Sequence, residues 1–332
     1  MKPGKTFWNI FVPALLLLFV PVIVFAVAAG DPRHANDGQA QTLATQTANE
    51  LERLLQMRMK QTFALAALPS FRAYASSDIT QRAGRATVAL REMEALVQAD
   101  KEIREVFITD ALGFTILASS NKFGVNWAHR EFVANALQGK LDASPPARDG
   151  GEFSSFYASP IIDNGGNVAG ALVLRIVAQE VWNTVYAARE ANCCYAVLSD
   201  ENGVRLADAG DQTKNFYAWA ALDSPTVSRL VGSQQYGAEM AQWRNTNAPT
   251  VARALKQASP PARIDADGYQ GAVAKLHTKP WTVFVVTTSP IPIPYVSLPL
   301  GLAILAAVIC AAALTWWIKE EQRGLATDRG EG

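Results

Sequence analysis

The sequence contains none of the common residue patterns around which enzyme and metal sites are built. It has no G-x-S-x-G nucleophile motif, no G-x-G-x-x-G motif or phosphate-binding loop, and no H-E-x-x-H zinc motif. Its three histidines, His34, His129 and His277, lie in separate segments, and none has a second ligand at metal-binding spacing. We therefore expect no catalytic residues, no metal site, no cofactor and no enzymatic activity.

One charged residue stands out by its position. Arg175 lies in the run AGALVLRIV, residues 169–177, in which apolar side chains occupy both faces of an expected strand. A guanidinium there either reaches water from the end of the strand or faces a pocket with a partner or ligand. The sequence leaves both interpretations open.

Two further positions have a structural and a functional interpretation. Asp163 precedes a glycine-rich turn, where Asp is favoured because its side chain bonds the turn backbone; a ligand contact is the alternative. The adjacent residues Cys193 and Cys194 could form a vicinal disulfide in an exported protein. Two small buried residues at the start of a strand are the expected case. The third cysteine, Cys310, lies in a long apolar run.

The overall charge excludes one class of partner. The 332 residues include 30 basic and 30 acidic side chains, which cancel, so no basic field indicates a nucleic-acid partner. Only 18% of the residues are charged and 49% are hydrophobic. Apolar residues must therefore be concentrated in particular segments.

They are concentrated near the two ends of the sequence. Residues 7–29 and 296–318 are uncharged, and each would span about 34 Å as a helix, enough to cross a bilayer. A cleavable signal peptide ending near Ala28 is the alternative for the first segment. Flanking lysine and arginine residues place the segments 1–6 and 319–332 in the cytoplasm and the intervening domain outside it.

The first half of that domain reads as helix, hairpin, helix, hairpin. Residues 35–66 predict one long helix and residues 79–99 a second. The period then changes to that of strands, with a hairpin at 105–119 and another at 153–177 around a strong Asn-Gly turn signal. Between the hairpins, residues 128–139 predict a short helix that ends at its glycine.

The second half repeats this plan in reduced form. Residues 195–207 predict a hairpin with Asn-Gly at the turn, and residues 272–288 predict a closing hairpin, with helical and polar sequence between. The sequence thus predicts an α+β fold of two mixed modules on the long helix, a first module at 67–178 and a second at 179–289.

The order of these motifs resembles that of a double Cache domain. The resemblance rests on EVFITDALGFTILASS from residue 105, on Arg130-Glu131-Phe132, on YASPIIDNGGNVAGALVLRI from residue 157, on YAVLSDENGVRLA from residue 195 and on KPWTVFVV from residue 279. Double Cache domains are the extracytoplasmic ligand-binding units of many bacterial chemoreceptors, sensor kinases and cyclases. The resemblance implies two PAS-like modules, of which the first is membrane-distal and holds the ligand and the second is membrane-proximal and transmits.

Members of this family usually continue after the second membrane span into a signalling module. Residues 319–332 are too short for one. The comparison therefore implies a separate signalling partner, such as a kinase, a cyclase or a chemoreceptor, or else a regulatory role or a gene fragment. We also expect a homodimer, formed through the long helix.

Cache domains that bind amino acids share a pattern that this sequence matches only in part. Arg130 and Phe132 fit the arginine and the aromatic residue that grip the carboxylate, and Asp163 fits the first acidic residue that receives the ammonium. The expected strand tyrosine is replaced by Ile161, and Arg175 falls near the place of the later acidic residue. An ammonium would be repelled there.

The resemblance and its departures together predict a small anion, such as a carboxylate, as the ligand. The predicted ligand-binding residues are Arg130, Arg175, Trp127, Phe132, Tyr157 and Asp163.

Two functions fit the sequence best, with an exported enzyme as a third and weaker alternative. The first is a ligand-binding sensory protein of the cell (inner) membrane, with its main domain periplasmic or extracellular. The second is a membrane scaffold with a degenerate Cache domain that binds no ligand. A sensor requires a pocket with convergent polar groups in the first module, whereas a scaffold would have that volume filled by large side chains.

Overall fold

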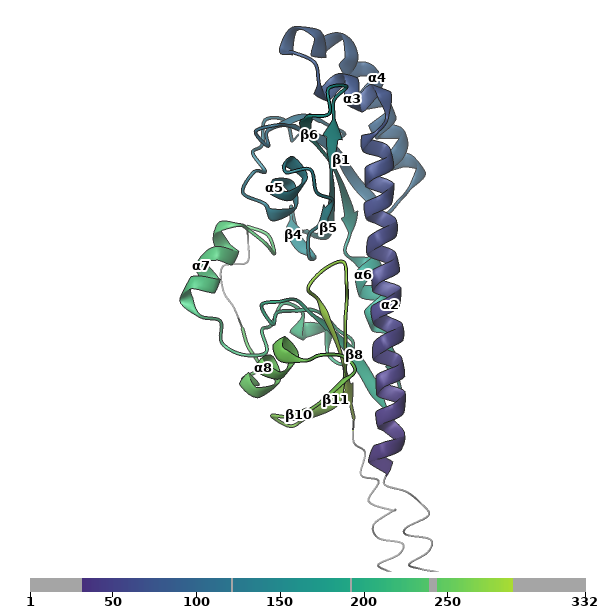
Figure 1. Ribbon diagram of the computed structural model, residues 1–332, viewed down its shortest axis with the longest axis vertical. Coiled ribbons are helices and arrows are strands. Elements are labelled where there is room, and N and C mark those ends of the chain that lie inside the picture. The colour runs from purple at the N-terminus through teal and green to yellow at the C-terminus, as the bar shows by residue number, and fades with distance from the viewer. Residues whose placement is uncertain (1–31, 121, 192, 239–243, 289–332) are drawn as a thin grey trace, which may run out of the picture. The chain divides into compact units, whose positions relative to one another are not determined.

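The computed structural model describes residues 32–120, 122–191, 193–238 and 244–288, with side chains from residue 38 onward (Figure 1). Asp37–Thr288 form one compact unit. Among the described residues, no helix is both long and apolar enough to cross a membrane. The two predicted membrane-spanning segments, 7–29 and 296–318, lie outside the described residues, as do the cytoplasmic segments predicted beside them.

Helix α2 (Pro32–Ala66) is the longest element and matches the predicted long helix. Its buried side chains recur every three or four positions, which places them in one stripe along the helix. They are Ala40, Ala44, Thr47, Ala48, Leu51, Leu55, Arg58, Thr62 and Ala66. The apolar members belong to one continuous hydrophobic core that also contains side chains of both β-sheets. Figure 1 shows the two sheets following one another along this helix.

A buried charge interrupts the apolar stripe. The Arg58 guanidinium binds both carboxylate oxygens of Glu180, donating through Nε at 3.0 Å and through Nη2. Its Nη1 donates to Asp100 Oδ2 at 2.6 Å and to Gln61 Oε1 at 2.9 Å. Although burial alone lowers the pKa of Arg58, the hydrogen bonds that it donates to Glu180 and Asp100 raise it above its usual range. The bridge joins α2 to the end of α4 and to the helix between the two sheets.

The first sheet is antiparallel, with strand order β2-β1-β6-β5-β3 and with β4 paired to β5. Alternate residues of a strand face opposite sides of the sheet. Leu172 and Leu174 therefore enter the core beside α2, and Ala171 and Val173 enter a second cluster that contains side chains of α5 (Glu131–Leu137). The strands are β1 (Ile103–Asp110), β2 (Thr115–Ala118), β3 (Asp142–Ala143), β4 (Ala147–Asp149), β5 (Glu152–Ile162) and β6 (Val168–Val177).

The second sheet repeats this plan. Its strand order is β10-β11-β12-β8-β7 with β9 paired to β8, so the β8–β9 hairpin corresponds to β1–β2, and β12 and β11 correspond to β6 and β5. Two antiparallel sheets with covering helices confirm the predicted α+β class. The strands are β7 (Arg189–Glu190), β8 (Cys194–Ser199), β9 (Arg205–Asp208), β10 (Ala262–Ala266), β11 (Tyr269–Lys275) and β12 (Thr282–Thr287).

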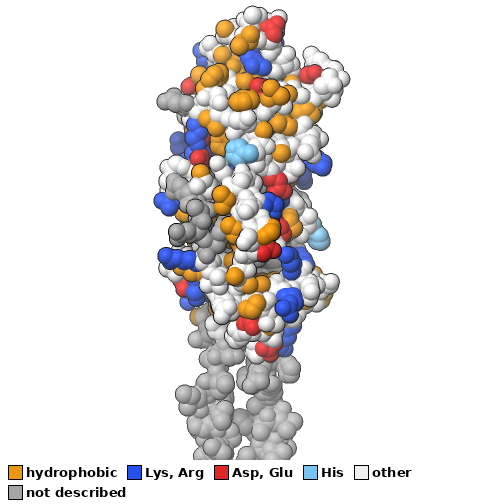
Figure 2. All heavy atoms as spheres, turned by 90° about the vertical axis from the view of Figure 1, so that its left-hand side faces the viewer, with side chains coloured by type: hydrophobic (Ala, Val, Ile, Leu, Met, Phe, Trp, Pro, Cys, Tyr) orange, Lys and Arg blue, Asp and Glu red, His pale blue; other side chains and the backbone are white. Residues whose placement is uncertain are grey.

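The other helices cover the two sheets. Helix α4 has the bounds that the sequence predicts and begins at Asp78, whose carboxylate accepts from the Thr80 and Gln81 N–H groups at 3.1 and 3.0 Å. Helices α5, α7 and α8 lie on the side of the sheets opposite to α2 (Figure 1). Figure 2 shows this side, where basic and acidic side chains are interspersed. The bounds are α3 (Pro69–Ala75), α4 (Ile79–Ala99), α6 (Gln179–Ala187), the 3-10 helix η1 (Gln212–Lys214), α7 (Ser224–Gly232) and α8 (Pro249–Gln257).

The cysteine pair differs from the expected case. Cys193 and Cys194 are joined in a vicinal disulfide, and both side chains are buried. The Cys193 carbonyl accepts from the backbone N–H of Thr288 at 2.7 Å and from its hydroxyl at 2.9 Å. The disulfide therefore lies beside the end of β12.

We predict that Arg58→Ala will lower the free energy of unfolding by about 3 kcal/mol, because removing one member of a buried ion pair leaves carboxylates without their counter-charge. Urea unfolding of the full chain in detergent, followed by tryptophan fluorescence, measures this. Arg53→Ala, at an exposed position of the same helix, is the matched control and should change the free energy by less than about 0.5 kcal/mol. Equal effects of the two variants would contradict the role of the bridge.

Candidate functional site

The face of the first sheet beneath α5 carries a cluster of four aromatic rings. Phe107 and Phe156 come from β1 and β5, Phe132 from α5, and Trp127 from the segment before α5. Neighbouring ring centroids lie 5.0 to 6.3 Å apart, and all four side chains are buried. The Trp127 indole N–H donates to Thr115 Oγ1 at 3.0 Å, which satisfies its polar group. The rings pack against one another, so a ligand has to bind at their edge.

Arg130 lies at this edge. Its Cζ is 5.6 to 5.7 Å from the ring centroids of Trp127, Phe132 and Phe156, and only 4% of the residue is exposed. Nη1 donates to Gln234 Oε1 at 3.5 Å, the long limit of a hydrogen bond. Nη2 is buried and has no hydrogen-bond partner among the described residues. Burial lowers the pKa of Arg130 to about 10. A buried cation with an unused donor is suited to binding an anion.

The space next to this guanidinium is small. A gap of about 20 Å³ lies between the two modules. Its lining includes the cations Arg130 and Lys279, the carboxylates Glu131, Asp142 and Glu201, and the neutral side chains Ser144 and Gln235. That volume holds about one water molecule. A carboxylate would fit only if the side chains that close the gap moved.

Arg175 faces the same side of the sheet, but its charge is compensated within the protein. Its Nε donates to Ser154 Oγ at 3.0 Å and its Nη2 to the Asp149 carbonyl at 2.6 Å. Its Nη1 lies 3.6 Å from Asp149 Oδ2 and 3.8 Å from Glu105 Oε2. Lys122 Nζ lies 3.5 Å from the same Glu105 oxygen. The Arg175 side chain therefore faces inward and pairs with protein groups rather than reaching water, and its contact with a ligand stays a prediction.

The structure places the remaining two predicted residues elsewhere. Tyr157 follows Phe156 on β5 and so faces the core beside α2, where burial raises the pKa of its hydroxyl. Asp163 lies in the β5–β6 turn, where its carboxylate accepts from the Gly165 and Asn167 N–H groups at 2.8 Å each. Its contacts are those of a turn residue. Arg130, Trp127, Phe132 and Arg175 thus share one face, and Tyr157 and Asp163 lie apart from it.

Several residues of this face were not identified from the sequence. Glu105 carried a signal, since a carboxylate in the apolar run EVFIT, 1% exposed in the fold, requires a partner. Phe107 and Phe156 looked like ordinary core residues. Lys122 and Asp149 carried no signal, because nothing in a loop sequence indicates which charges will meet.

The second module contacts the first beside Arg130. The Arg148 N–H donates to the Tyr236 carbonyl at 2.9 Å. The next residue, Gly237, has φ of 102°, and a Cβ there would collide with the Arg148 backbone, so only glycine fits. In the same region, Lys279 Nζ donates to Asp142 Oδ1 at 2.7 Å, and both side chains are largely buried. The segment 233–237 and the β11–β12 turn therefore form the contact between the modules.

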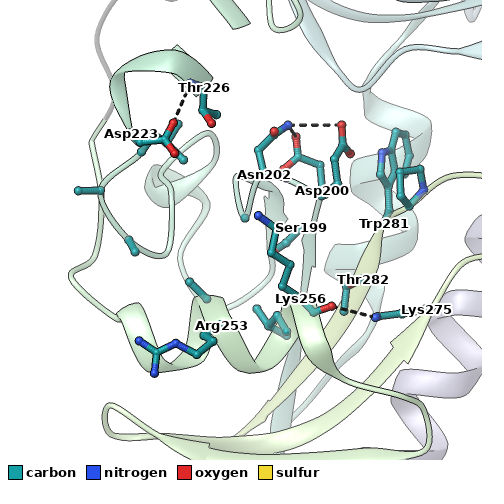
Figure 3. A pocket seen from close by; sticks show the side chains of 18 of the residues that line it. Ser199, Asp200, Asn202, Asp223, Thr226, Arg253, Lys256, Lys275, Trp281 and Thr282 are labelled. Atoms are coloured by element: carbon teal, nitrogen blue, oxygen red, sulfur yellow. Dashed lines mark hydrogen bonds between the residues drawn. The ribbon is translucent and has the colours of Figure 1, made fainter. Parts of the chain in front are cut away.

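A cavity of about 470 Å³ lies within the second module, between the β8–β9 turn, α8 and the start of β12 (Figure 3). Asp200 is buried in its wall and accepts a short hydrogen bond from the Tyr236 hydroxyl. Burial, and next the negative charge of Glu201, raise the pKa of Asp200 to about 6. On the opposite side, Lys275 Nζ donates to the Lys256 carbonyl at 3.4 Å.

The arrangement of the described residues is that of known sensor domains. The sensor domain of the histidine kinase DctB from V. cholerae is similar, with a TM-score of 0.61 at 15% sequence identity over 76% of this chain and 96% of that one. The ligand-binding domain of the Pseudomonas aeruginosa PAO1 amino acid chemoreceptor PctC, in complex with GABA, gives 0.51 at 16% identity over 76% and 99%. That of the Campylobacter jejuni chemoreceptor Tlp3, in complex with 4-methylisoleucine, gives 0.52 at 14% identity over 78% and 94%.

At these low sequence identities, the similarities establish the fold of the described residues. The described part of the chain has the double Cache fold of bacterial sensor domains, which confirms the resemblance predicted from the sequence motifs. No protein-family model and no curated protein matches the sequence.

The raised pKa of Asp200 predicts a pH-dependent stability. Because the pKa is raised above 3.8, to about 6, the folded state binds the proton more tightly than the unfolded state, and this stabilisation is lost as pH rises from about 4 to 6. Asp200→Asn abolishes the titration. The Tm of the variant minus that of the unsubstituted chain should therefore increase from pH 4 to pH 7 in thermal unfolding.

The control variant, Asp223→Asn, should show a pH dependence of the Tm difference with the opposite sign. Asp223 is exposed, and hydrogen bonds from Thr226 lower the pKa of its carboxyl. Its stabilisation is present at neutral pH and is lost as pH falls, so the Tm difference for Asp223→Asn should decrease from pH 4 to pH 7. If the Tm differences of the two variants changed with pH in the same direction, the raised pKa assigned to Asp200 would be contradicted.

Proposed function

We propose that this chain is a membrane-anchored sensory protein whose domain outside the cytoplasm binds a small anion, such as a carboxylate, in the first module. The observation that carries the proposal is the Arg130 guanidinium, which is buried against three rings with Nη2 unpartnered among the described residues. Leaving such a donor unused is costly, and an anion would satisfy it. The fold shared with ligand-binding domains of chemoreceptors supports this assignment.

In this proposal the anion binds at the gap beside Arg130 and replaces Gln234. The hydrogen bond from Arg130 to Gln234 is long, and its acceptor is a neutral amide oxygen. A carboxylate therefore accepts a stronger hydrogen bond from the guanidinium. Trp127 and Phe132 supply the apolar wall. Arg175 keeps its bonds to Asp149 and Glu105, and it acts by neutralising carboxylates that would otherwise repel the anion.

Displacing Gln234 would also transmit the signal. Gln234 belongs to the segment 233–237, so ligand entry changes the contact between the modules. The β11–β12 turn lies at the same contact, where Lys279 binds Asp142. The backbone N–H groups of His277 and Thr278 donate to the Glu52 carboxylate of α2 at 2.9 to 3.1 Å. A ligand that favours one arrangement of these contacts would shift both α2 and β12.

Further parts of the proposal come from the sequence. We propose an inner-membrane location with a periplasmic or extracellular domain, a homodimer formed through α2, no catalytic turnover, and a separate signalling partner. A scaffold without a ligand is the second candidate. The observation that favours it is the dense ring cluster beneath α5, and the binding experiment below separates the two.

We predict that Arg130→Gln will weaken carboxylate binding about 10- to 100-fold, because one charge-assisted hydrogen bond contributes about 1.5 to 3 kcal/mol. Isothermal titration of the full chain in detergent with acetate, pyruvate and succinate measures the affinity. The chloride salt of the same cation controls for ionic strength.

Arg91→Gln, at an exposed position of α4, is the matched control and should bind like the unsubstituted chain. Binding that survives in Arg130→Gln would refute the site. Absence of binding by every carboxylate, in a chain that unfolds cooperatively, would favour the scaffold.

The relay gives a separate prediction. Saturating carboxylate should change hydrogen exchange at the amides of 233–237 and of the β11–β12 turn, because both contact the binding region. In Lys279→Met the change should persist at 233–237 and disappear from the turn, since the link to Asp142 is lost. Lys140→Met, at an exposed position in the first module, should behave like the unsubstituted chain. An unaltered response of the turn in Lys279→Met would exclude this route.

A further inference from the structure

The cavity of the second module has no role in the function proposed above. It has a volume of about 470 Å³, and its wall combines the buried indole of Trp281 with polar side chains of three β-strands (β8, β11 and β12), the β8–β9 turn, α7 and α8. Ligand sites in proteins are concave, have volumes of this order, and combine apolar walls with a few placed polar groups. The distribution of charge in the wall indicates what the cavity binds.

One side of the cavity is acidic, and no cation of the described residues lies within ion-pair distance of its carboxylates, although Glu201 also lines the gap that contains Arg130 and Lys279. Asp200 and Glu201 are consecutive residues of the β8–β9 turn, and the charge of Glu201 contributes to the raised pKa of Asp200. Their hydrogen bonds come from neutral groups, namely the side chains of Asn202, Tyr236 and Gln235 and backbone N–H groups of the turn. Neither carboxylate forms an ion pair with any described residue. An ammonium placed beside them would remove this repulsion.

The other side is basic. Asp223 lies in the same wall, and the charge of Lys256 helps to lower the pKa of its carboxyl, but the two side chains form no ion pair. Lys275 projects from β11, and Lys256 and Arg253 project from α8 in the same wall. Within the described part of the chain, none of the three has a carboxylate within ion-pair distance. Lys275 is half-buried and its only described side-chain hydrogen bond is the long one to the Lys256 carbonyl. Figure 3 shows Lys275 and Asp200 on opposite sides of the cavity.

We propose that this cavity is a second binding site, for a small zwitterion that carries an ammonium and a carboxylate. The ammonium lies against Glu201 and Asp200, the carboxylate accepts from Lys275 and Lys256, and the carbon chain between them lies on Trp281. A simple anion would leave the negative charges of the two acidic side chains uncompensated. A simple amine would leave the positive charges of the lysines uncompensated. Only a ligand with both charges satisfies both sides.

The experiment uses ω-amino carboxylates of two to six carbons, from glycine to 6-aminohexanoate, because the series samples the separation of the two charges. Each is titrated by calorimetry into the full chain in detergent, beside the alkyl carboxylate and the alkylamine of the same length. We expect at least one zwitterion to bind at least 10-fold more tightly than both of its matched ions.

Two variants then locate the site. Lys275→Gln and Glu201→Gln should each weaken binding of that zwitterion about 10- to 100-fold, since each removes one charge-assisted contact. The exposed positions Lys101→Gln and Glu94→Gln carry the same chemical changes outside the cavity and should leave the affinity unchanged. Failure of every zwitterion to bind, equal affinity for a matched ion, or full affinity in either cavity variant would overturn the proposal.

Repeating the titration in Arg130→Gln separates this site from the one in the first module. If the cavity binds as proposed, the zwitterion keeps its affinity in that variant whether or not carboxylates bind at Arg130. Loss of zwitterion binding in Arg130→Gln, with full binding in Lys275→Gln, would assign it to the first module and overturn the second site.

Discussion

The described structure depends on one constraint, which is that α2 buries a single stripe against both sheets at once. The alanines at its start and the leucines that follow join the apolar side chains of both modules in one core. Arg58 lies in the same stripe and is held by Asp100, at the end of α4 in the first module, and by Glu180, at the start of the second module. A buried ion pair of this kind tolerates little change in geometry, because its desolvation is offset only by close contacts. The two modules are therefore fixed to one helix.

This constraint leaves the opposite faces of the sheets for polar sites, and the two modules use them differently. In the first, rings fill the space beneath α5 and a single guanidinium closes their edge. In the second, the face that corresponds to it is packed with Trp219 and the buried Arg205, whose guanidinium lies 3.7 Å from the Trp219 ring and binds Asp208 at 2.9 Å. The cavity of the second module lies instead beyond the β8–β9 turn. One repeated plan thus supports two sites with different chemistry, because each face is filled by a different set of side chains.

Errors in the sequence interpretation have simple physical causes. Phe63 is a large apolar side chain of α2, yet it is 53% exposed, and alanines are buried instead. Small side chains let a helix approach a sheet closely, so hydrophobicity alone did not identify the contact face. Tyr157 was expected in the pocket, yet alternation along β5 turns it away from the face that carries Phe156. That error was avoidable, since period 2 is visible in the sequence.

The sequence by itself determined the elements, because helical periodicity, strand alternation and Asn-Gly turn signals are local properties. It located α4 to the residue, the four hairpins and the repeat of the plan. The resemblance to Cache domains drew attention to Arg130 and Phe132, whose role in binding stays a prediction. Only the tertiary structure decided which charges meet. Arg175 is paired because β1 lies beside β6 and brings Glu105 opposite it. Among the described residues, Arg130 keeps an unpaired donor because segment 233–237 offers its guanidinium only an amide oxygen. The charges of the second cavity come from a hairpin turn, α8 and β11, which no local pattern relates. Contacts between residues far apart in the chain depend on strand register and module packing, and the short-range patterns of the sequence do not encode these directly.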